Sequence, residues 1–106
     1  MSVLSIWTWS SLVSEADAVR EAVDVLVAHC CDEHPLIKRL EWVSAISEDG
    51  DRVDFQWLEG YGSQEAMNND HYTDECKALW EPVRRHAIEG TFTGRAWNEG
   101  GGFAPR

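Results

Sequence analysis

The sequence predicts a single α+β domain with the element order β-α-β-β-α-β, and three observations support this class. Residues 14–31 and 73–89 repeat apolar side chains at the three- and four-residue steps of amphipathic helices. Four other stretches are rich in branched and aromatic residues, as strands are. An Asp-Gly pair at 49–50 separates two of these stretches and is typical of a hairpin. This order predicts a four-stranded antiparallel sheet with the helices on one face.

The first half of the chain is predicted to form a strand, a helix and a second strand. Residues 3–12 (VLSIWTWSSL) are β-rich and lack a helical stripe, so they form the first strand. Ser14 is the N-cap of the helix over 14–31, with acids in its first turn. Pro35 ends this helix, because the residue before a proline is disfavoured in the α region. Residues 40–47 (LEWVSAIS) then alternate as the second strand.

The second half begins with a strand and continues with a helix in two pieces. Residues 52–61 (RVDFQWLEGY) alternate as the third strand. One face of this strand carries Val53, Phe55 and Trp57. A short helix covers 62–69, and a longer one covers 73–89. The apolar stripe of the longer helix consists of Cys76, Leu79, Trp80, Val83 and Ala87.

The end of the domain is defined by a proline, a glycine and a last strand. Pro82 is expected to kink the long helix or to mark a fresh helical start. Gly90 caps that helix, and residues 91–98 (TFTGRAWN) form the fourth strand. The domain therefore covers residues 1–99, and residues 100–106 form a flexible tail. Since the helices cover one sheet face only, we expect a homodimer through the other faces.

Charge and composition disfavour several classes of partner. The chain has 9 Lys and Arg against 19 Asp and Glu, and this net charge of −10 disfavours binding to nucleic acid or to anionic membranes. Residues 1–12 lack a secretory leader pattern, and no apolar run is long enough to cross a bilayer. We therefore expect a cytoplasmic protein, with its three cysteines reduced.

Short motifs indicate which family of ferredoxin-like proteins the chain resembles. His34-Pro35 lies between the first helix and the second strand, and the third strand runs into EGYGSQEAMNNDHYTDECKALWEPV at 59–83. The positions that carry the resemblance there are Tyr61, Ser63, Glu65, Ala66 and His71. In these features the chain resembles the dimeric α+β barrel proteins of the antibiotic biosynthesis monooxygenase-like family.

The resemblance implies a homodimer with its two sheets face to face and a pocket in each subunit between the sheet and the helices. Characterised relatives include cofactor-free oxygenases that act on polycyclic phenols, which implies a monooxygenase without a cofactor, acting on a small aromatic or phenolic ligand. The alternative is a non-catalytic dimer that binds a small molecule or acts as an accessory protein. The sequence contains no phosphate loop, dinucleotide fingerprint or nucleophile elbow that would decide between the two.

His71 is the candidate catalytic residue. It lies in the break between the two helical pieces, and the pKa of an imidazole suits proton abstraction from a phenol. The alternative is a histidine that faces water at a helix entry. The candidate ligand-binding residues are Trp57, Tyr61, Tyr72 and Trp80. Aromatic residues of this kind also serve as ordinary core residues.

The run AHCCDEHP at 28–35 places six possible metal ligands side by side. On a helix Cys30 and His34 would share a face, as paired zinc ligands do. Pro35, however, takes His34 out of helical geometry. Further ligands would have to come from His71, Cys76 or His86. We therefore expect no metal here, but a helix end at which His29 offsets the helix dipole and Cys30 packs inward.

Overall fold

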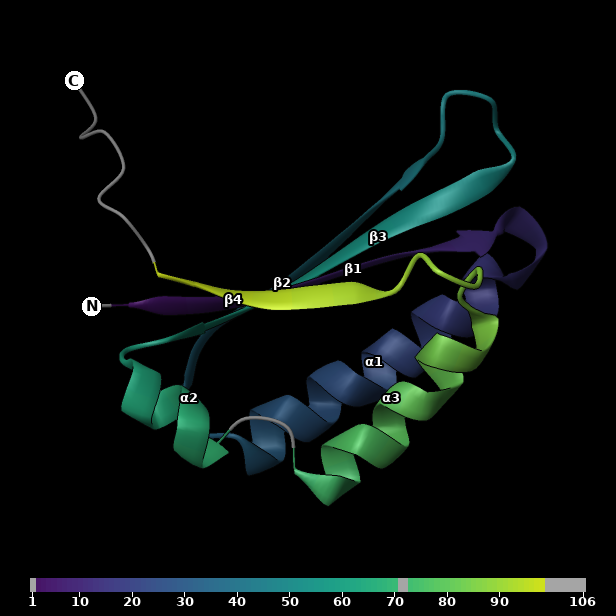
Figure 1. The fold of residues 1–106 in the computed structure, drawn as a ribbon. Coiled ribbons are helices and arrows are strands. Elements are labelled where there is room, and N and C mark those ends of the chain that lie inside the picture. Colours follow the sequence, from purple (N-terminus) through teal and green to yellow (C-terminus); the bar gives the residue numbers. More distant parts are fainter. Residues whose placement is uncertain (1, 71–72, 99–106) are drawn as a thin grey trace.

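The computed structural model describes residues 2–70 and 73–98, which form two layers. A four-stranded antiparallel sheet makes one layer, and the helices make the other, all on the same side of the sheet (Figure 1). The elements are β1 (Val3–Leu12), a 3₁₀ turn η1 (Val13–Glu15), α1 (Ala16–Glu33), β2 (Ile37–Ile46), β3 (Arg52–Tyr61), α2 (Gln64–Asp70), α3 (Asp74–His86) and β4 (Thr93–Asn98). The predicted ferredoxin-like fold is confirmed.

The sheet has the strand order β2-β3-β1-β4, so β1 and β3 are its inner strands. Trp7 of β1 lies opposite Trp57 of β3 on one side and opposite Gly94 of β4 on the other. A Cβ atom on Gly94 would come within 2.1 Å of the Trp7 indole, so only glycine leaves room for this ring. The hairpin between β2 and β3 turns through Gly50 at φ 75°, which confirms the predicted Asp-Gly turn.

The first helix starts two residues later than predicted. Ser14 does not cap it, because Ser14 lies in η1 and α1 begins at Ala16. Glu15 occupies the N-cap position, but its side chain makes no capping hydrogen bond to the helix. At the other end His34 leaves helical geometry with φ −122° and ψ 73°, as expected for the residue before Pro35.

Two strands also differ from prediction at their first residues, whereas β1 and β3 have the predicted bounds. β2 begins at Ile37 and not at Leu40, because Ile37 pairs with Tyr61 across a local register shift. β4 begins at Thr93 and not at Thr91. Pairing with a neighbouring strand sets both of these boundaries.

The long helix ends earlier than predicted and does not restart at its proline. α3 runs through Pro82 as one helix, so the predicted fresh start is wrong. It ends at His86 because Ala87 turns to an extended conformation and bridges to Ser11 of β1. Gly90, at φ 83°, therefore lies in the turn beyond the helix and does not cap it.

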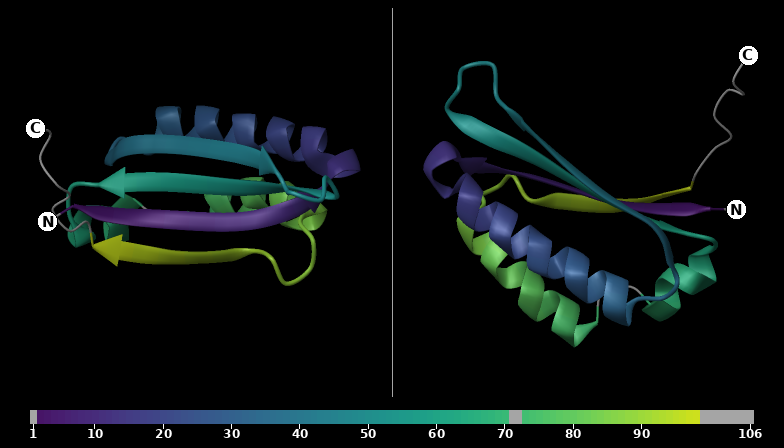
Figure 2. Two further views of the ribbon diagram at one scale, coloured as in Figure 1. Left: turned by 90° about the horizontal axis from the view of Figure 1, so that it is seen from above. Right: turned by 180° about the vertical axis from the view of Figure 1, so that it is seen from behind.

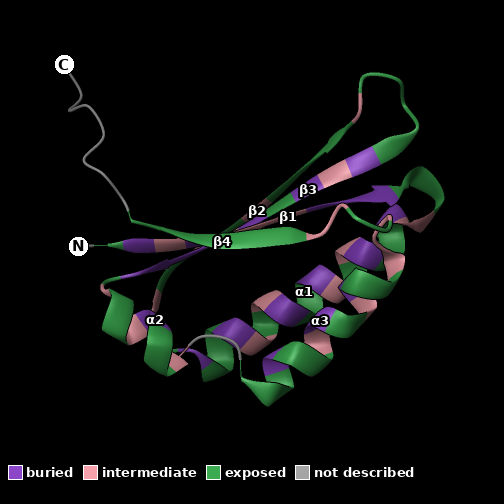
Figure 3. Cartoon of the chain, in the orientation of Figure 1, coloured by how far each residue is buried: buried purple, intermediate pink, exposed green. Residues whose placement is uncertain are grey.

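Buried residues gather where the sheet faces the helices (Figure 3). This core is strongly aromatic. Trp80 of α3 meets the rings of Trp57 and Trp9 edge to face, at centroid distances of 5.2 and 5.6 Å. Trp9 stacks on Phe55 of β3 at 5.4 Å. The buried members of the two predicted helical stripes are Val19, Val23, Leu26, Cys30, Cys76, Trp80 and Val83.

The opposite face of the sheet has no helix over it in the described part of the chain (Figure 2). Alternation along the strands places Leu4, Ile6 and Leu58 on this face, all half-buried. Val43 and Trp97 on the same face are 60% and 43% exposed. This outer face thus presents apolar side chains to its surroundings.

The predicted tail, residues 100–106, lies outside the described residues. Among those described, none of the helices combines the length and the apolar character needed to cross a membrane.

Candidate functional site

A buried carboxylate lies on the inner face of β3, where the aromatic core ends. The alternation that turns Phe55 and Trp57 toward the helices continues to Glu59 and Tyr61. Glu59 is only 4% exposed, which is rare for an acidic residue. A carboxylate in such a place requires hydrogen-bond donors around it.

Two side chains of the same strand donate to Glu59. The Nε1–H of Trp57 donates to Oε1 at 2.7 Å, and the hydroxyl of Tyr61 donates to Oε2 at 2.8 Å. Burial, and then the charge of Glu59, raises the pKa of Tyr61 far above its ordinary value. The Tyr61 hydroxyl therefore keeps its proton and remains a donor at neutral pH.

From the helical layer, a buried histidine is held by two partners. His34 has its Nδ1 atom 2.6 Å from the backbone carbonyl oxygen of Asp70, at the end of α2. Its Nε2 atom lies 3.2 Å from the Nε2 atom of His29. Asp70 also accepts the backbone N–H of Leu36 at 2.9 Å, which ties α2 to the segment before β2.

Two buried thiols join the helices α1 and α3. Cys30 and Cys76 share a side-chain hydrogen bond. This bond, and then burial and the charge of Glu59, raises the pKa of Cys30 well above its ordinary value, so Cys30 stays a thiol. The electrostatic influence of Glu59 on Cys30 links the strand and helix residues. We define the polar cluster as His29, Cys30, His34, Glu59, Tyr61 and Cys76.

Two cavities flank the polar cluster. One, of about 250 Å³, lies between the end of α1 and β2 and is lined by Cys30, His34 and Leu40 among others. The other, of about 330 Å³, is lined by both histidines of the polar cluster and by Thr73 at the start of α3. A small molecule or an ion can therefore approach the polar cluster from either side of His34.

The structure describes three of the predicted ligand-binding residues. Trp57 and Tyr61 flank the buried carboxylate, and Trp80 packs against Trp57 in the core. The predicted catalytic residue His71 and the predicted ligand-binding residue Tyr72 lie outside the described residues. Their predicted roles, and those of the three described aromatic residues, stay predictions.

Sequence reasoning missed the buried carboxylate and underrated the histidine pair. Glu59 shares its strand parity with Trp57, and this parity is the signal that could have identified it. Of the three residues named as further ligands for the 28–35 run, Cys76 does reach His29 and His34. His86 instead pairs with Glu15.

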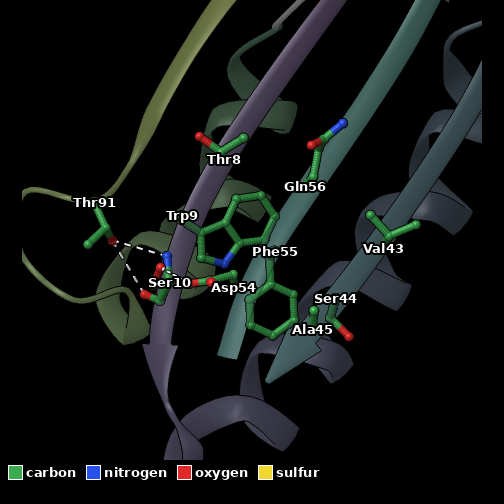
Figure 4. Close-up of a pocket in the computed structure, with 10 residues that line it drawn as sticks. All are labelled: Thr8, Trp9, Ser10, Val43, Ser44, Ala45, Asp54, Phe55, Gln56 and Thr91. Carbon is green, nitrogen blue, oxygen red and sulfur yellow. Dashed lines mark hydrogen bonds between the residues drawn. The ribbon is translucent and has the colours of Figure 1, made fainter. Parts of the chain in front are cut away.

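A larger groove lies nearer the β2–β3 hairpin (Figure 4). Its volume is about 540 Å³, and Trp9 and Phe55 are among its lining residues. Ser10 donates through its hydroxyl to Asp54 at 2.6 Å and through its backbone N–H to the Thr91 hydroxyl at 3.1 Å. Its described lining thus combines aromatic, aliphatic and polar side chains, which suits the binding of a small molecule.

Solved structures resemble this fold over most of the chain. A proposed antibiotic biosynthesis monooxygenase from Caulobacter crescentus CB15 has a TM-score of 0.76 at 17% identity, over 94% of this chain and 91% of that chain. SnoaB, a cofactor-independent oxygenase from Streptomyces nogalater, has a TM-score of 0.69 at 8% identity, over 92% of each chain. A dimeric protein of unknown function from Bacteroides fragilis NCTC 9343 has a TM-score of 0.70 at 11% identity, over 92% and 96%. The fold is that of antibiotic biosynthesis monooxygenase-like proteins.

This likeness confirms the family resemblance at the level of the fold. No family model matches the sequence, and a search of curated proteins finds no match. At such low identities the neighbours establish how the chain folds and leave its reaction open.

Proposed function

We propose that this protein is a cofactor-independent monooxygenase that binds a small aromatic or phenolic molecule between its sheet and its helices. The observation that supports the proposal best is the buried Glu59 carboxylate, held between Trp57 and Tyr61 at the edge of the aromatic core. In this proposal a phenol enters from a flanking cavity, with its hydroxyl toward Glu59 and its ring against aromatic side chains.

In this proposal His71 is the general base. The residues on either side of the 71–72 segment support this role, because Asp70 contacts His34 and Thr73 lines the cavity beside His34. Removal of the phenolic proton gives an anion that reduces oxygen directly. One oxygen atom then enters the ring as a carbonyl and the other leaves as water, so the substrate supplies all the electrons.

Oxygen uptake with mono-, bi- and tricyclic phenols tests this reaction. His71→Ala is expected to lower turnover by about 10²–10⁴, the usual contribution of a general base, and to leave the melting temperature nearly unchanged. His86→Ala is the matched control, since His86 pairs with Glu15 instead of joining the polar cluster. Equal activity in His71→Ala and the wild type would contradict the catalytic role.

A second candidate function is a non-catalytic dimer that binds an apolar molecule. It is favoured by the groove lined by Trp9, Phe55 and the outer-face residue Val43, which a second copy on that face would cover. Native mass spectrometry of the purified protein distinguishes the two candidates. A retained small molecule without oxygen uptake supports the binding dimer, whereas oxygen uptake supports the oxygenase.

Both candidates are proposed to be cytoplasmic homodimers that associate through the outer sheet face. The apolar outer face supports this, and so does the dimeric neighbour from Bacteroides fragilis. Stable associations usually bury more than about 1,000 Å², which a four-stranded sheet face can supply. Light scattering at micromolar concentration should give twice the chain mass, and a folded monomer would contradict the proposal.

A further inference from the structure

Three side chains of the polar cluster have the donor set of a transition-metal site. His29 lies in α1, His34 follows α1 directly, and Cys76 lies in the first turn of α3. One ligand atom from each of the three lies within 4.8 Å of the other two. His34 and Cys76 are buried, so the atoms meet under the end of the helix pair and not on an exposed surface.

The hydrogen bond of His34 to Asp70 prepares its other nitrogen for a metal. A backbone carbonyl oxygen only accepts, so the Nδ1 atom of His34 carries the proton and donates at 2.6 Å. The Nε2 atom of the neutral ring then has a free lone pair, directed toward His29. Histidine ligands of metals usually donate their second N–H to a carbonyl or carboxylate in this way.

The spacing of the two imidazoles agrees with a shared tetrahedral ion. Two nitrogens bound to one zinc ion at the usual bond length, with a tetrahedral angle between them, lie about 3.3–3.4 Å apart. The observed Nε2–Nε2 distance between His29 and His34 is 3.2 Å. The thiolate of Cys76 would add a soft third ligand to these borderline nitrogens.

The surroundings favour a cation and leave room for a fourth ligand. The cavity of about 330 Å³ beside the two histidines is also lined by the acidic residues Glu33, Asp74 and Glu75. The chain has a net charge of −10, which adds to the local attraction for a cation. Water or one of these carboxylates can complete the coordination.

From this geometry we propose that His29, His34 and Cys76 bind one zinc-class divalent ion per chain, joining the end of α1 to the start of α3. The proposal reverses the expectation drawn from the sequence, in which no metal binds near residues 28–35. It stands apart from the proposed oxygenase reaction, because zinc undergoes no redox change. The competing explanation is a simple N–H···N hydrogen bond between the two imidazoles.

Cobalt substitution of the full chain tests the proposal directly. Protein without an affinity tag is treated with a chelator, reduced with a phosphine and titrated with Co²⁺, and then with Zn²⁺ as the competitor. We expect one ion per chain, a tetrahedral visible spectrum and a thiolate-to-cobalt charge-transfer band, all displaced by zinc. Binding of zinc to the folded state should also raise the melting temperature.

Variants assign the ligands. Cys76→Ser should abolish the charge-transfer band, and His34→Ala should weaken zinc binding by more than the roughly 10–100-fold that loss of an outer-shell partner costs. Cys31→Ser is the matched control, because Cys31 belongs to the same run and is exposed. Its spectrum and affinity should equal those of the wild type.

Three results would overturn the proposal. In the first, the wild-type protein binds less than one ion per chain. In the second, it gives an octahedral spectrum without the thiolate band. In the third, Cys31→Ser lowers the affinity as much as Cys76→Ser does. The first two use only the wild-type protein, so they decide the matter even where a variant fails to fold. Each of these results would leave the imidazole hydrogen bond as the explanation.

Discussion

The interior of this protein has two ends with opposite chemistry, although the same strand supplies both. Toward the β2–β3 hairpin, the inner face of β3 carries Val53, Phe55 and Trp57, which pack on the helices in an aromatic core. Two and four residues further on, the same face carries Glu59 and Tyr61. The two-residue period of β3 thus determines which side chains are buried, but it does not determine whether those side chains are apolar.

The two ends also differ in whether their buried polar atoms have hydrogen-bond partners. In the aromatic end, within the described part of the chain, the buried Nε1 atom of Trp9 has no hydrogen-bond partner. In the polar end, the Glu59 carboxylate accepts from Tyr61 and from Trp57, whose indole stands at the boundary between the two ends. The aromatic end is therefore held by area and ring packing, and the polar end by specific hydrogen bonds.

The largest expected effect on stability comes from removing an aromatic ring from the aromatic end. Trp80→Ala removes the ring that contacts Trp57 and Trp9 edge to face, and such a truncation costs about 3–5 kcal/mol in the free energy of unfolding. Urea denaturation followed by circular dichroism measures it. Val25→Ala on the exposed side of α1 is the control and should change stability by less than about 0.5 kcal/mol. If Trp80→Ala lost no more stability than Val25→Ala, the ring contacts would not be what stabilises the aromatic end.

A matched pair of substitutions compares the two ends directly. Trp57→Phe and Trp9→Phe remove the same atoms from two buried indoles, so the loss of volume is similar in both. Trp57→Phe also removes a donor to the Glu59 carboxylate, whereas Trp9→Phe removes an N–H without a partner. Trp57→Phe should therefore be the more destabilising by about 1.5–3 kcal/mol, the usual value of a hydrogen bond to a charged group. Equal losses in urea denaturation would contradict the contrast between the ends.

This contrast also explains how much the sequence could predict. The aromatic end follows from period alone, which is why the bounds of β1 and β3 are confirmed, and so are both helical stripes apart from Ala87. The end of α3 at His86 was not predictable locally, because it depends on pairing of Ala87 with Ser11, far away in the chain. Tertiary pairing of this kind overrides local propensity.

The polar end was harder to predict for a related reason. Pro35 correctly predicted that His34 leaves the helix, but local geometry could not show that the ring then meets His29 and Cys76. Cys76 lies on another helix, and Asp70, which fixes the ring of His34, lies on a third. The meeting of residues from three elements is a property of the packed fold, so the spacing of these residues along the chain does not predict it.

The smallest expected effect is a pH dependence that belongs to the polar end alone. Burial and the charge of Glu59 raise the pKa of Tyr61 above its ordinary value of 10.0, so the folded state holds the proton more tightly than the unfolded state. This contribution to stability is complete below about pH 10 and is lost as the pH rises further, because only the unfolded chain then releases the proton. The loss should approach about 1.4 kcal/mol for each pH unit above 10. Urea denaturation from pH 8 to 11.5 should therefore show a steeper decline for the wild type than for Tyr61→Phe, which keeps Cys30 and lacks the phenol, and parallel declines would contradict the assignment to Tyr61.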